Sequence, residues 1–283
     1  MKKILLLGNT GKMGIALNKI FKNEYKLVGK NSADYNASNF DEVKKLIVSE
    51  DPDIVINTVA IMGIDYCELN PEKAFRINAL YPRYLSSLSK HRGFTLIHFS
   101  SEAVFSDSNN SYLYEDDPVE PINVYGMTKY AGDCFVAANS DNYYICRLPI
   151  IFGESIKKNQ FVEKMLTLID EGNTMLKISN DIISSPSYSI DIAKTVKALI
   201  EDEYNSGVYH VSNNAMGSLY DLITEILKNL QIDVKIEPTT YKDFEHIGNK
   251  NTCTPLSSIK IDALRDWRLA VHEYCKTIQN KAI

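Results

Sequence analysis

Two side chains that can do chemistry together, Tyr125 and Lys129, lie four residues apart in the stretch 121–133. On a helix this spacing places both side chains on one face, one turn apart. A free tyrosine has a pKa of about 10, and an ammonium group beside it favours the phenolate and lowers that pKa. Such a pair can exchange a proton with a bound substrate. A solvated tyrosine and lysine on an amphipathic helix would show the same spacing, so the neighbouring elements must decide.

The N-terminal stretch predicts a nucleotide-binding turn. Residues 3–7 form a short apolar run that is typical of a strand buried on both faces. Gly8, Gly11 and Gly14 follow directly, and an amphipathic helical pattern starts after them. Glycines let backbone amides approach a pyrophosphate, and a helix N-terminus favours negative charge. A plain turn would use the same glycines, but their place after the first strand favours a dinucleotide.

The next two predicted strands, 25–29 and 53–57, complete the expected cofactor edge. Lys30 ends the first of them, where a basic side chain suits the 2′-phosphate of NADPH, although an exposed lysine is unremarkable there. Asp34 and Tyr35 follow, and we expect them to cover the adenine. Small and apolar residues at 60–62 come after the other strand, where a dinucleotide can lie across the sheet.

Predicted helices and strands alternate through the rest of the first half of the chain. Helices are predicted at 39–50 and 71–90, and strands at 94–99 and 143–147, with the helix of Tyr125 between these strands. Such alternation predicts an α/β fold with a Rossmann-type doubly wound parallel sheet. Ser101 follows the strand at 94–99. Its hydroxyl can hold a substrate oxygen, although a serine at a strand end is often only a turn or cap residue.

Beyond Pro149 the alternation becomes irregular. The sequence predicts helices at 159–172, 189–201, 218–230 and 270–280, strands at 207–211 and 232–237, and a turn at 184–187. We therefore predict a dinucleotide-binding domain at 1–150 and a smaller C-terminal α/β lobe at 151–283, some segments of which return to the Rossmann core. A cleft between two such units is the usual place for a substrate.

Composition excludes several classes of function. The chain of 283 residues carries 31 Lys and Arg against 36 Asp and Glu, so no basic field for a nucleic-acid partner is expected. No apolar run is long enough to span a membrane. The five cysteines suggest neither a disulfide framework nor a zinc site, which fits a cytoplasmic protein. No metal cluster is predicted; scattered acidic residues leave open magnesium binding at a subunit contact, and a homodimer is compatible with the sequence.

These features together resemble the dTDP-4-dehydrorhamnose reductase family of extended short-chain dehydrogenase/reductases, almost from end to end. The most specific match is Pro-x-Asn-x-Tyr-Gly-x-x-Lys-x-x-Gly, which contains Tyr125 and Lys129. The matching stretches are 8–14, 53–60, 64–68, 78–79, 98–105, 114–132, 147–153, 160–166 and 185–188. Their shared order implies an NAD(P)H-dependent reductase of a 4-keto-6-deoxy sugar nucleotide.

The resemblance also implies a role for each matching residue. Tyr125 would donate a proton to the sugar C4 ketone, Lys129 would hold the nicotinamide ribose and lower the pKa of the tyrosine, and Ser101 would bind the ketone oxygen. The expected cofactor contacts are Gly8, Thr10, Gly11, Lys12, Met13, Gly14, Lys30, Asp34, Tyr35, Ala60, Ile61 and Met62, together with Tyr125 and Lys129. The expected substrate contacts are Ser101, Glu102, Tyr125, Ile150, Asn159 and Gln160. The cofactor is expected to be NADPH, with NADH as the alternative.

The chain departs from the family pattern around the pocket. Glu102 replaces an aspartate, Ala103 replaces a tyrosine, and Ile150 stands where the family has a tryptophan. Lys30 stands where many members have an aspartate, and the pair at 61–62 is less polar than usual. The expected substrate class is therefore a keto-sugar nucleotide rather than the rhamnose precursor in particular.

Two other functions share this fold. A nucleoside-diphosphate-sugar 4-epimerase or dehydratase uses the same Tyr/Lys pair, usually with a longer C-terminal lobe and a cofactor retained through the cycle. A non-catalytic subunit, similar to the regulatory β subunit of methionine adenosyltransferase, would act by binding another protein. The presence of Ser101, Tyr125 and Lys129 favours the reductase over this subunit.

Overall fold

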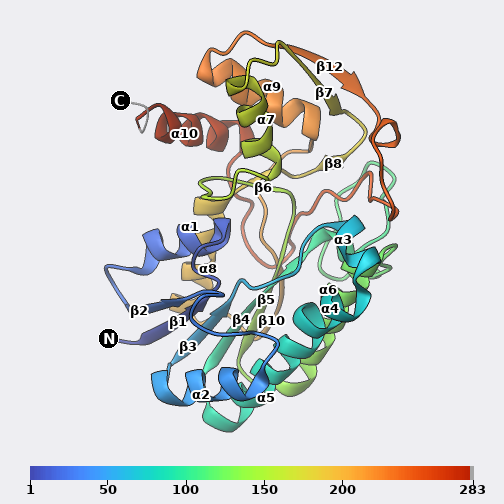
Figure 1. The fold of residues 1–283 in the computed structure, drawn as a ribbon. Helices are drawn as coiled ribbons and strands as arrows, with labels where there is room; N and C mark the ends of the chain where they lie inside the picture. Colours follow the sequence, from blue (N-terminus) through green and yellow to red (C-terminus); the bar gives the residue numbers. More distant parts are fainter. Residues whose placement is uncertain (281–283) are drawn as a thin grey trace.

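A six-stranded parallel sheet forms the centre of the structure, a computed structural model that describes residues 1–280 (Figure 1). The strand order is β2–β1–β3–β4–β5–β10. The chain therefore places β2 on one side of β1 and then crosses over to place β3 on the other side of β1. The strands are β1 (Lys3–Leu7), β2 (Lys26–Lys30), β3 (Ile54–Asn57), β4 (Thr95–Ser101), β5 (Tyr143–Leu148) and β10 (Gly207–His210). The predicted Rossmann-type α/β fold is confirmed, and ligands of such sheets bind at the carboxyl ends of the strands.

Helices cover both faces of this sheet, and the apolar side chains of β1 point alternately to the two faces. Ile4 and Leu6 lie in the cluster formed with α1 (Lys12–Phe21) and α8 (Ser189–Glu201). Leu5 and Leu7 lie in the opposite cluster, with α2 (Phe40–Glu50) and α5 (Tyr81–Arg92). All four side chains are fully buried. The apolar run at 3–7 therefore forms the doubly buried strand that its composition predicts.

The predicted helix at 71–90 is interrupted. It consists of α4 (Pro71–Phe75), the π-helical segment η1 (Arg76–Leu80) and α5. Pro82 has no N–H to donate to the carbonyl of Asn78, and its ring would clash with that carbonyl in a regular α-helix. A wider π-helical turn accommodates the proline. The predicted long helix was therefore correct in extent and wrong in regularity.

The C-terminal half contributes a second core around Trp267, which is 1 % exposed. Its helices are α7 (Phe161–Asp170), α9 (Leu219–Leu230) and α10 (Trp267–Gln279), and a parallel pair joins β7 (Met175–Ser179) to β12 (Lys235–Thr239). In the region predicted as a turn at 184–187, Ser185 and Pro186 connect two short strands, β8 (Ile183–Ser184) and β9 (Ser187–Tyr188), which were not predicted. The remaining elements are α3 (Ile64–Leu69), η2 (Glu102–Val104), α6 (Val124–Asn139), β6 (Ile151–Phe152), β11 (Gly217–Ser218) and η3 (Tyr241–Asp243).

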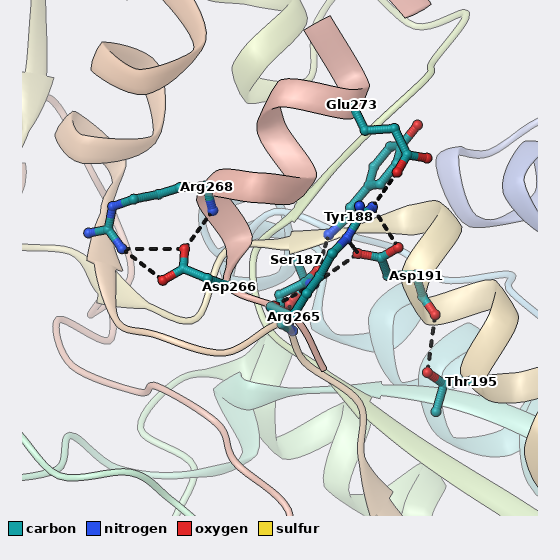
Figure 2. Close-up of polar contacts among 9 residues, drawn as sticks. Ser187, Tyr188, Asp191, Thr195, Arg265, Asp266, Arg268 and Glu273 are labelled. Atoms are coloured by element: carbon teal, nitrogen blue, oxygen red, sulfur yellow. Dashed lines mark hydrogen bonds and ion pairs between the residues drawn. The ribbon is translucent and has the colours of Figure 1, made fainter. Parts of the chain in front are cut away.

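A partly buried ionic network joins the two halves of the molecule (Figure 2). Arg265 donates to both carboxylate oxygens of Asp191 on α8, at 2.8 and 2.9 Å, and lies 2.7 Å from Glu273 on α10. The amide of Asn213 also donates to Asp191, at 2.9 Å. Since α8 packs on the sheet while α10 belongs to the second core, this network fixes one against the other. The division of the chain at residue 150 stays a prediction, and residues 281–283 of the predicted lobe lie outside the described part.

Two structural features of residues 1–280 bear on other function classes. None of the helices in this range is both long and apolar enough to cross a membrane. Within the same range, no group of three or more His, Cys, Asp and Glu side chains is arranged to hold a metal ion.

Candidate active site

The glycine turn after β1 leaves no room for a side chain at Gly8 or Gly14. Gly8 has a φ of 87°, and a Cβ on Gly14 would lie 2.3 Å from the Gly8 carbonyl oxygen. Gly11 precedes α1 without a side-chain cap, and the first turn of α1 carries no acidic residue. The amides at this helix start therefore lack a side-chain acceptor and suit an anion. A glycine cradle at the strand switch point fits the pyrophosphate of a dinucleotide.

Two side chains of this turn, those of Lys12 and Met13, make their contacts inside the protein. Lys12 is 7 % exposed, and its ammonium nitrogen lies 3.1 Å from a carboxylate oxygen of Glu163 on α7. Burial lowers the pKa of Lys12, while Glu163 opposes that shift. Met13 is also buried, in the core beneath α1. Of the predicted contacts at 12 and 13, only the backbone remains at the turn, whereas Thr10 is half-buried there.

In the region where the adenine end of the cofactor is expected, two of the predicted contact residues also bind other side chains of the protein. The ammonium group of Lys30 lies 3.4 Å from Glu50 at the end of α2, so its charge is partly neutralised. Tyr35 is 8 % exposed and its hydroxyl is 2.8 Å from that of Tyr81. Tyr35 thus packs into the core, and the expectation that it covers the adenine stays a prediction. Asp34 is exposed and accepts a hydrogen bond from the Asn31 amide at 2.7 Å.

Asn78 links the cofactor edge to the helix of Tyr125. Its amide group accepts from the Ile61 N–H and donates to the Ile61 carbonyl, both at 2.9 Å. The same nitrogen lies 3.1 Å from the hydroxyl of Thr128 on α6. Asn78 therefore fixes the predicted contacts Ala60, Ile61 and Met62 relative to α6. Sequence reasoning used this asparagine only as a family match; the proline four residues later was the signal for an irregular turn here.

Tyr125 and Ser101 meet at the end of β4. Ser101 accepts a hydrogen bond from the Ala103 amide at 3.2 Å, and its hydroxyl lies near enough to the phenol of Tyr125 to act on the pKa of that phenol. Asn123 caps α6 by accepting from the Gly126 amide at 2.8 Å, which orients the first turn that carries Tyr125. Burial raises the pKa of Tyr125 to about 12, against the lowering effect of Ser101. The phenol is therefore protonated at neutral pH.

Lys129 is placed differently from the expectation. It is 2 % exposed, and its ammonium group donates to the Phe99 carbonyl at 2.5 Å. Burial lowers its own pKa to about 8, while the charge of Asp133 acts in the opposite direction. The expected lowering of the tyrosine pKa is absent, because the pKa of Tyr125 rises and burial is the main cause. The amine is held by the backbone of β4 rather than by the phenol.

A buried polar network that the sequence did not predict lies beneath Lys129. Asp133, one turn further along α6, accepts from Arg147 at 3.2 Å. His98 lies 4.0 Å from Asp133, and burial lowers the pKa of this histidine, so the ring is neutral. The residue four positions after Lys129 was the available signal, because i and i+4 share a helix face.

The predicted substrate residues fall into two groups. Glu102 bonds the hydroxyl of Ser184 and the amide of Ile150, and burial raises its pKa to about 8. The structure therefore brings Glu102 and Ile150 to the same edge as Ser101 and Tyr125. Asn159 is exposed before α7, and Gln160 is half-buried with no described partner for its amide oxygen. A contact of Asn159 or Gln160 with substrate stays a prediction.

Known proteins resemble this chain over nearly its whole length. The family model "RmlD substrate binding domain" matches residues 1–280. A spore coat polysaccharide biosynthesis protein, SpsK, of Bacillus subtilis is 29% identical over 282 residues, covering 97% of both chains. A solved dTDP-4-dehydrorhamnose reductase of Clostridium acetobutylicum is 30% identical with a TM-score of 0.91, and the match covers 98% of this chain and 99% of that one. A Bacillus anthracis reductase solved with NADP has the same fold, at 24% identity, a TM-score of 0.91 and coverage of 98% and 99%.

Proposed function

This chain belongs to the RmlD substrate binding domain family, and we propose that it reduces the C4 ketone of a 4-keto-6-deoxy sugar nucleotide with NADPH or NADH. The observation that carries the proposal is the contact between the Tyr125 phenol and Ser101 at the end of β4, beside the glycine cradle of β1. This arrangement supports a proton donor and a hydroxyl that act together with a bound dinucleotide. Membership of the family and the reductases among its similar proteins support the same reaction class.

The chain's own groups bind, orient and protonate in this reaction. The nicotinamide, when bound, supplies hydride to the carbonyl carbon. Ser101 donates to or accepts from the ketone oxygen and holds it near the phenol, and Tyr125 transfers its hydroxyl proton to that oxygen. A phenol with a pKa of about 12 retains this proton until negative charge develops on the oxygen. Lys129, whose ammonium group is held by the Phe99 carbonyl of β4, would hold the ribose of a bound cofactor.

The alternatives have less support. The family of this chain and its similar reductases favour reduction over epimerisation or dehydration. A purely regulatory role would not require the hydroxyl of Ser101 to lie beside the phenol of Tyr125, whereas these two groups do lie together here. The reductase is therefore the function that the geometry supports best.

Several finer assignments remain our proposals. We propose NADPH as the preferred cofactor because Lys30 ends β2, although Glu50 shares its charge. We propose a cytoplasmic protein because all five cysteines are unpaired in the structure, as in a reducing compartment. A homodimer also remains a proposal, with the sequence as its support.

The test is an assay of nicotinamide absorbance with a panel of 4-keto-6-deoxy sugar nucleotides. Oxidation of NADPH that depends on one of these substrates, with the 4-hydroxy sugar as product, is the expected result. The proposal is wrong if no substrate causes oxidation and another protein copurifies with this chain. Cofactor that survives purification and is not consumed would instead indicate an epimerase.

A further inference from the structure

A buried carboxylate lies one helical turn after Lys129, and no step of the proposed reaction uses it. Asp133 and Lys129 are four residues apart on α6, so their side chains share one face of the helix. Each of the two residues is 2 % exposed. Two side chains of opposite charge are therefore removed from water on the same face of α6, which packs against β4 and β5.

Burial disfavours the charged form of Lys129. It lowers the pKa of the amine to about 8, and the negative charge of Asp133 opposes this fall. An ammonium group has three N–H donors, and one of them goes to the Phe99 carbonyl. The others suit the hydroxyls of a bound ribose, and hydrogen bonds from a charged donor are about twice as strong as those between neutral groups. Loss of the charge would therefore weaken the hold on a cofactor.

Asp133 is kept as a carboxylate by the groups around it. Arg147 on β5 donates from Nε at 3.2 Å, and its guanidinium stays protonated at physiological pH. Burial raises the pKa of Asp133, whereas Arg147, Ser100 and Lys129 all lower it. The buried oxygen Oδ1 has no hydrogen-bond partner among the described residues. The carboxylate is therefore charged at neutral pH, and one of its oxygens is not used by a direct donor.

His98 on β4 faces both charged groups and is itself neutral. Its Nε2 lies 4.0 Å from Oδ1 of Asp133, and burial together with the charge of Lys129 lowers its pKa. The amide nitrogen of Asn57 lies 3.3 Å from Nδ1 of the ring, while the amide oxygen of Asn57 accepts from the Val59 N–H at 3.1 Å. Nδ1 is thus an acceptor, and the ring proton is on Nε2, toward Asp133. His98 presents a dipole to the carboxylate rather than a competing charge.

Titratable groups on the other elements that contact α6 do not supply this negative charge. Burial raises the pKa of Glu102 on η2 to about 8 and that of the Cys67 thiol on α3 to about 11, so both are mainly protonated at neutral pH. The carboxylates of Asp65 and Glu68 on α3 bind backbone amides. Burial keeps the pKa of Tyr81 on α5 well above its usual value, and the charged residues of α4, η1 and α5 are exposed. Within residues 1–280, Asp133 is the carboxylate that offsets the burial of Lys129.

We propose that Asp133 is a positioning residue of the reaction, whose charge keeps Lys129 an ammonium ion at the ribose of the cofactor. This inference rests on the proposed function, because it takes a nicotinamide dinucleotide as the partner of Lys129. It gives a role to a carboxylate that acts only through Lys129. It also predicts that cofactor binding weakens as the pH rises through the titration of Lys129.

The direct test follows the charge of Lys129 in the whole chain without cofactor. The lysine ε-carbons are labelled with ¹³C, and the signal that is absent from Lys129→Met is titrated by NMR between pH 6 and 10. The wild-type midpoint should lie near 8. Asp133→Asn should lower this midpoint to about 7, a tenfold loss of proton affinity, because one nearby opposite charge is removed. Asp133→Glu retains the charge and should titrate as the wild type does.

NADPH binding, measured by fluorescence, is the second readout. If the ammonium form binds the ribose, the apparent affinity follows the fraction of that form. Asp133→Asn should then bind NADPH about fivefold more weakly than the wild type at pH 8 and almost equally at pH 6. A general loss of structure would weaken binding at both pH values. The matched control is Asp191→Asn on α8, which breaks another carboxylate–arginine pair, with Arg265, and should leave the Lys129 midpoint unchanged.

The outcomes separate this inference from the proposed function. If Asp133→Asn does not fold, D133N/R147Q neutralises both members of the pair, and its Lys129 midpoint should still lie below that of the wild type. An unchanged midpoint in the folded variant would overturn the inference, and so would an equal shift in Asp191→Asn or NADPH affinity that does not depend on pH. If the wild type oxidises NADPH with a keto-sugar nucleotide despite such a result, the inference alone is wrong. If that oxidation is absent, the proposed function fails, and the inference fails with it.

Discussion

Replacing Glu102 by glutamine should make the protein more stable, by an amount that grows with pH. Burial raises the pKa of Glu102 from 4.5 to about 8, and its partners are the Ser184 hydroxyl and the Ile150 amide. Native Glu102 is therefore protonated at neutral pH, whereas the unfolded chain has already lost that proton. A glutamine keeps an uncharged group of the same shape at this position.

The sign of the effect follows from proton linkage. A group whose pKa is raised on folding contributes fully below its unfolded pKa, and this contribution is lost as the pH rises through the folded value. With values of 4.5 and about 8, the loss is about 1 kcal/mol at pH 5, about 3 kcal/mol at pH 7 and about 4 kcal/mol at pH 8. The variant has no such loss.

Urea unfolding of both proteins at pH 5, 6, 7 and 8 would measure the difference. Glu115→Gln is the matched control, because the amides of His210 and Ile259 bond that carboxylate and its pKa is lowered. Glu115 contributes above its unfolded pKa, and its contribution is lost as the pH falls through the folded value. The control should thus be less stable than the wild type at pH 7. A difference between wild type and Glu102→Gln that stays constant from pH 5 to 8 would refute the reasoning.

Three further changes test the site and the fold. Tyr125→Phe should lower kcat by about 10²- to 10⁴-fold, since it removes the proton donor, while NADPH binding measured by fluorescence stays nearly unchanged; a rate near that of wild type would remove Tyr125 from the mechanism. Lys30→Asp should shift the ratio of affinities from NADPH toward NADH, and because Glu50 already shares the charge of Lys30, a change of about fivefold is expected; an unchanged ratio would show that Lys30 does not contact the 2′-phosphate. Arg265→Ala should lower the free energy of unfolding by about 2 kcal/mol, since it leaves Asp191 with a single side-chain donor, Asn213; chemical denaturation checks this, and a loss below about 0.5 kcal/mol would contradict a joining role for the network.

The sequence predicted those elements that are specified by a local pattern of apolar and capping residues. The apolar run at 3–7 became a strand buried on both faces, and Asn39 caps α2 by accepting from the amides of Asp41 and Glu42. These features depend on neighbours in the chain, so local rules are sufficient for them.

The features that the sequence did not predict depend on partners distant in the chain. Tyr35 was expected at the adenine, but its hydroxyl pairs with Tyr81, 46 residues away, in the core. The strand β7 was missed because its pairing partner, β12, lies about 60 residues later and has few apolar residues. The effect of Lys129 was expected from its spacing to Tyr125, yet the direction of the ammonium group is set by the Phe99 carbonyl. Spacing indicates which residues share a face, but not which atoms they bind.

The two glycines of α6 explain how one short motif can position the whole site. A Cβ on Gly126 would lie 2.0 Å from the Ala103 carbonyl oxygen, and one on Gly132 would lie 2.3 Å from the Asn78 carbonyl oxygen. Glycine weakens a helix interior by about 1 kcal/mol relative to alanine, so both positions cost stability. In return α6 packs directly against the backbone of η2 and of η1. The first contact brings Tyr125 to Ser101, and the second brings Thr128 to Asn78, which holds the cofactor edge. The glycines of the motif are therefore as necessary to the geometry as its tyrosine and lysine.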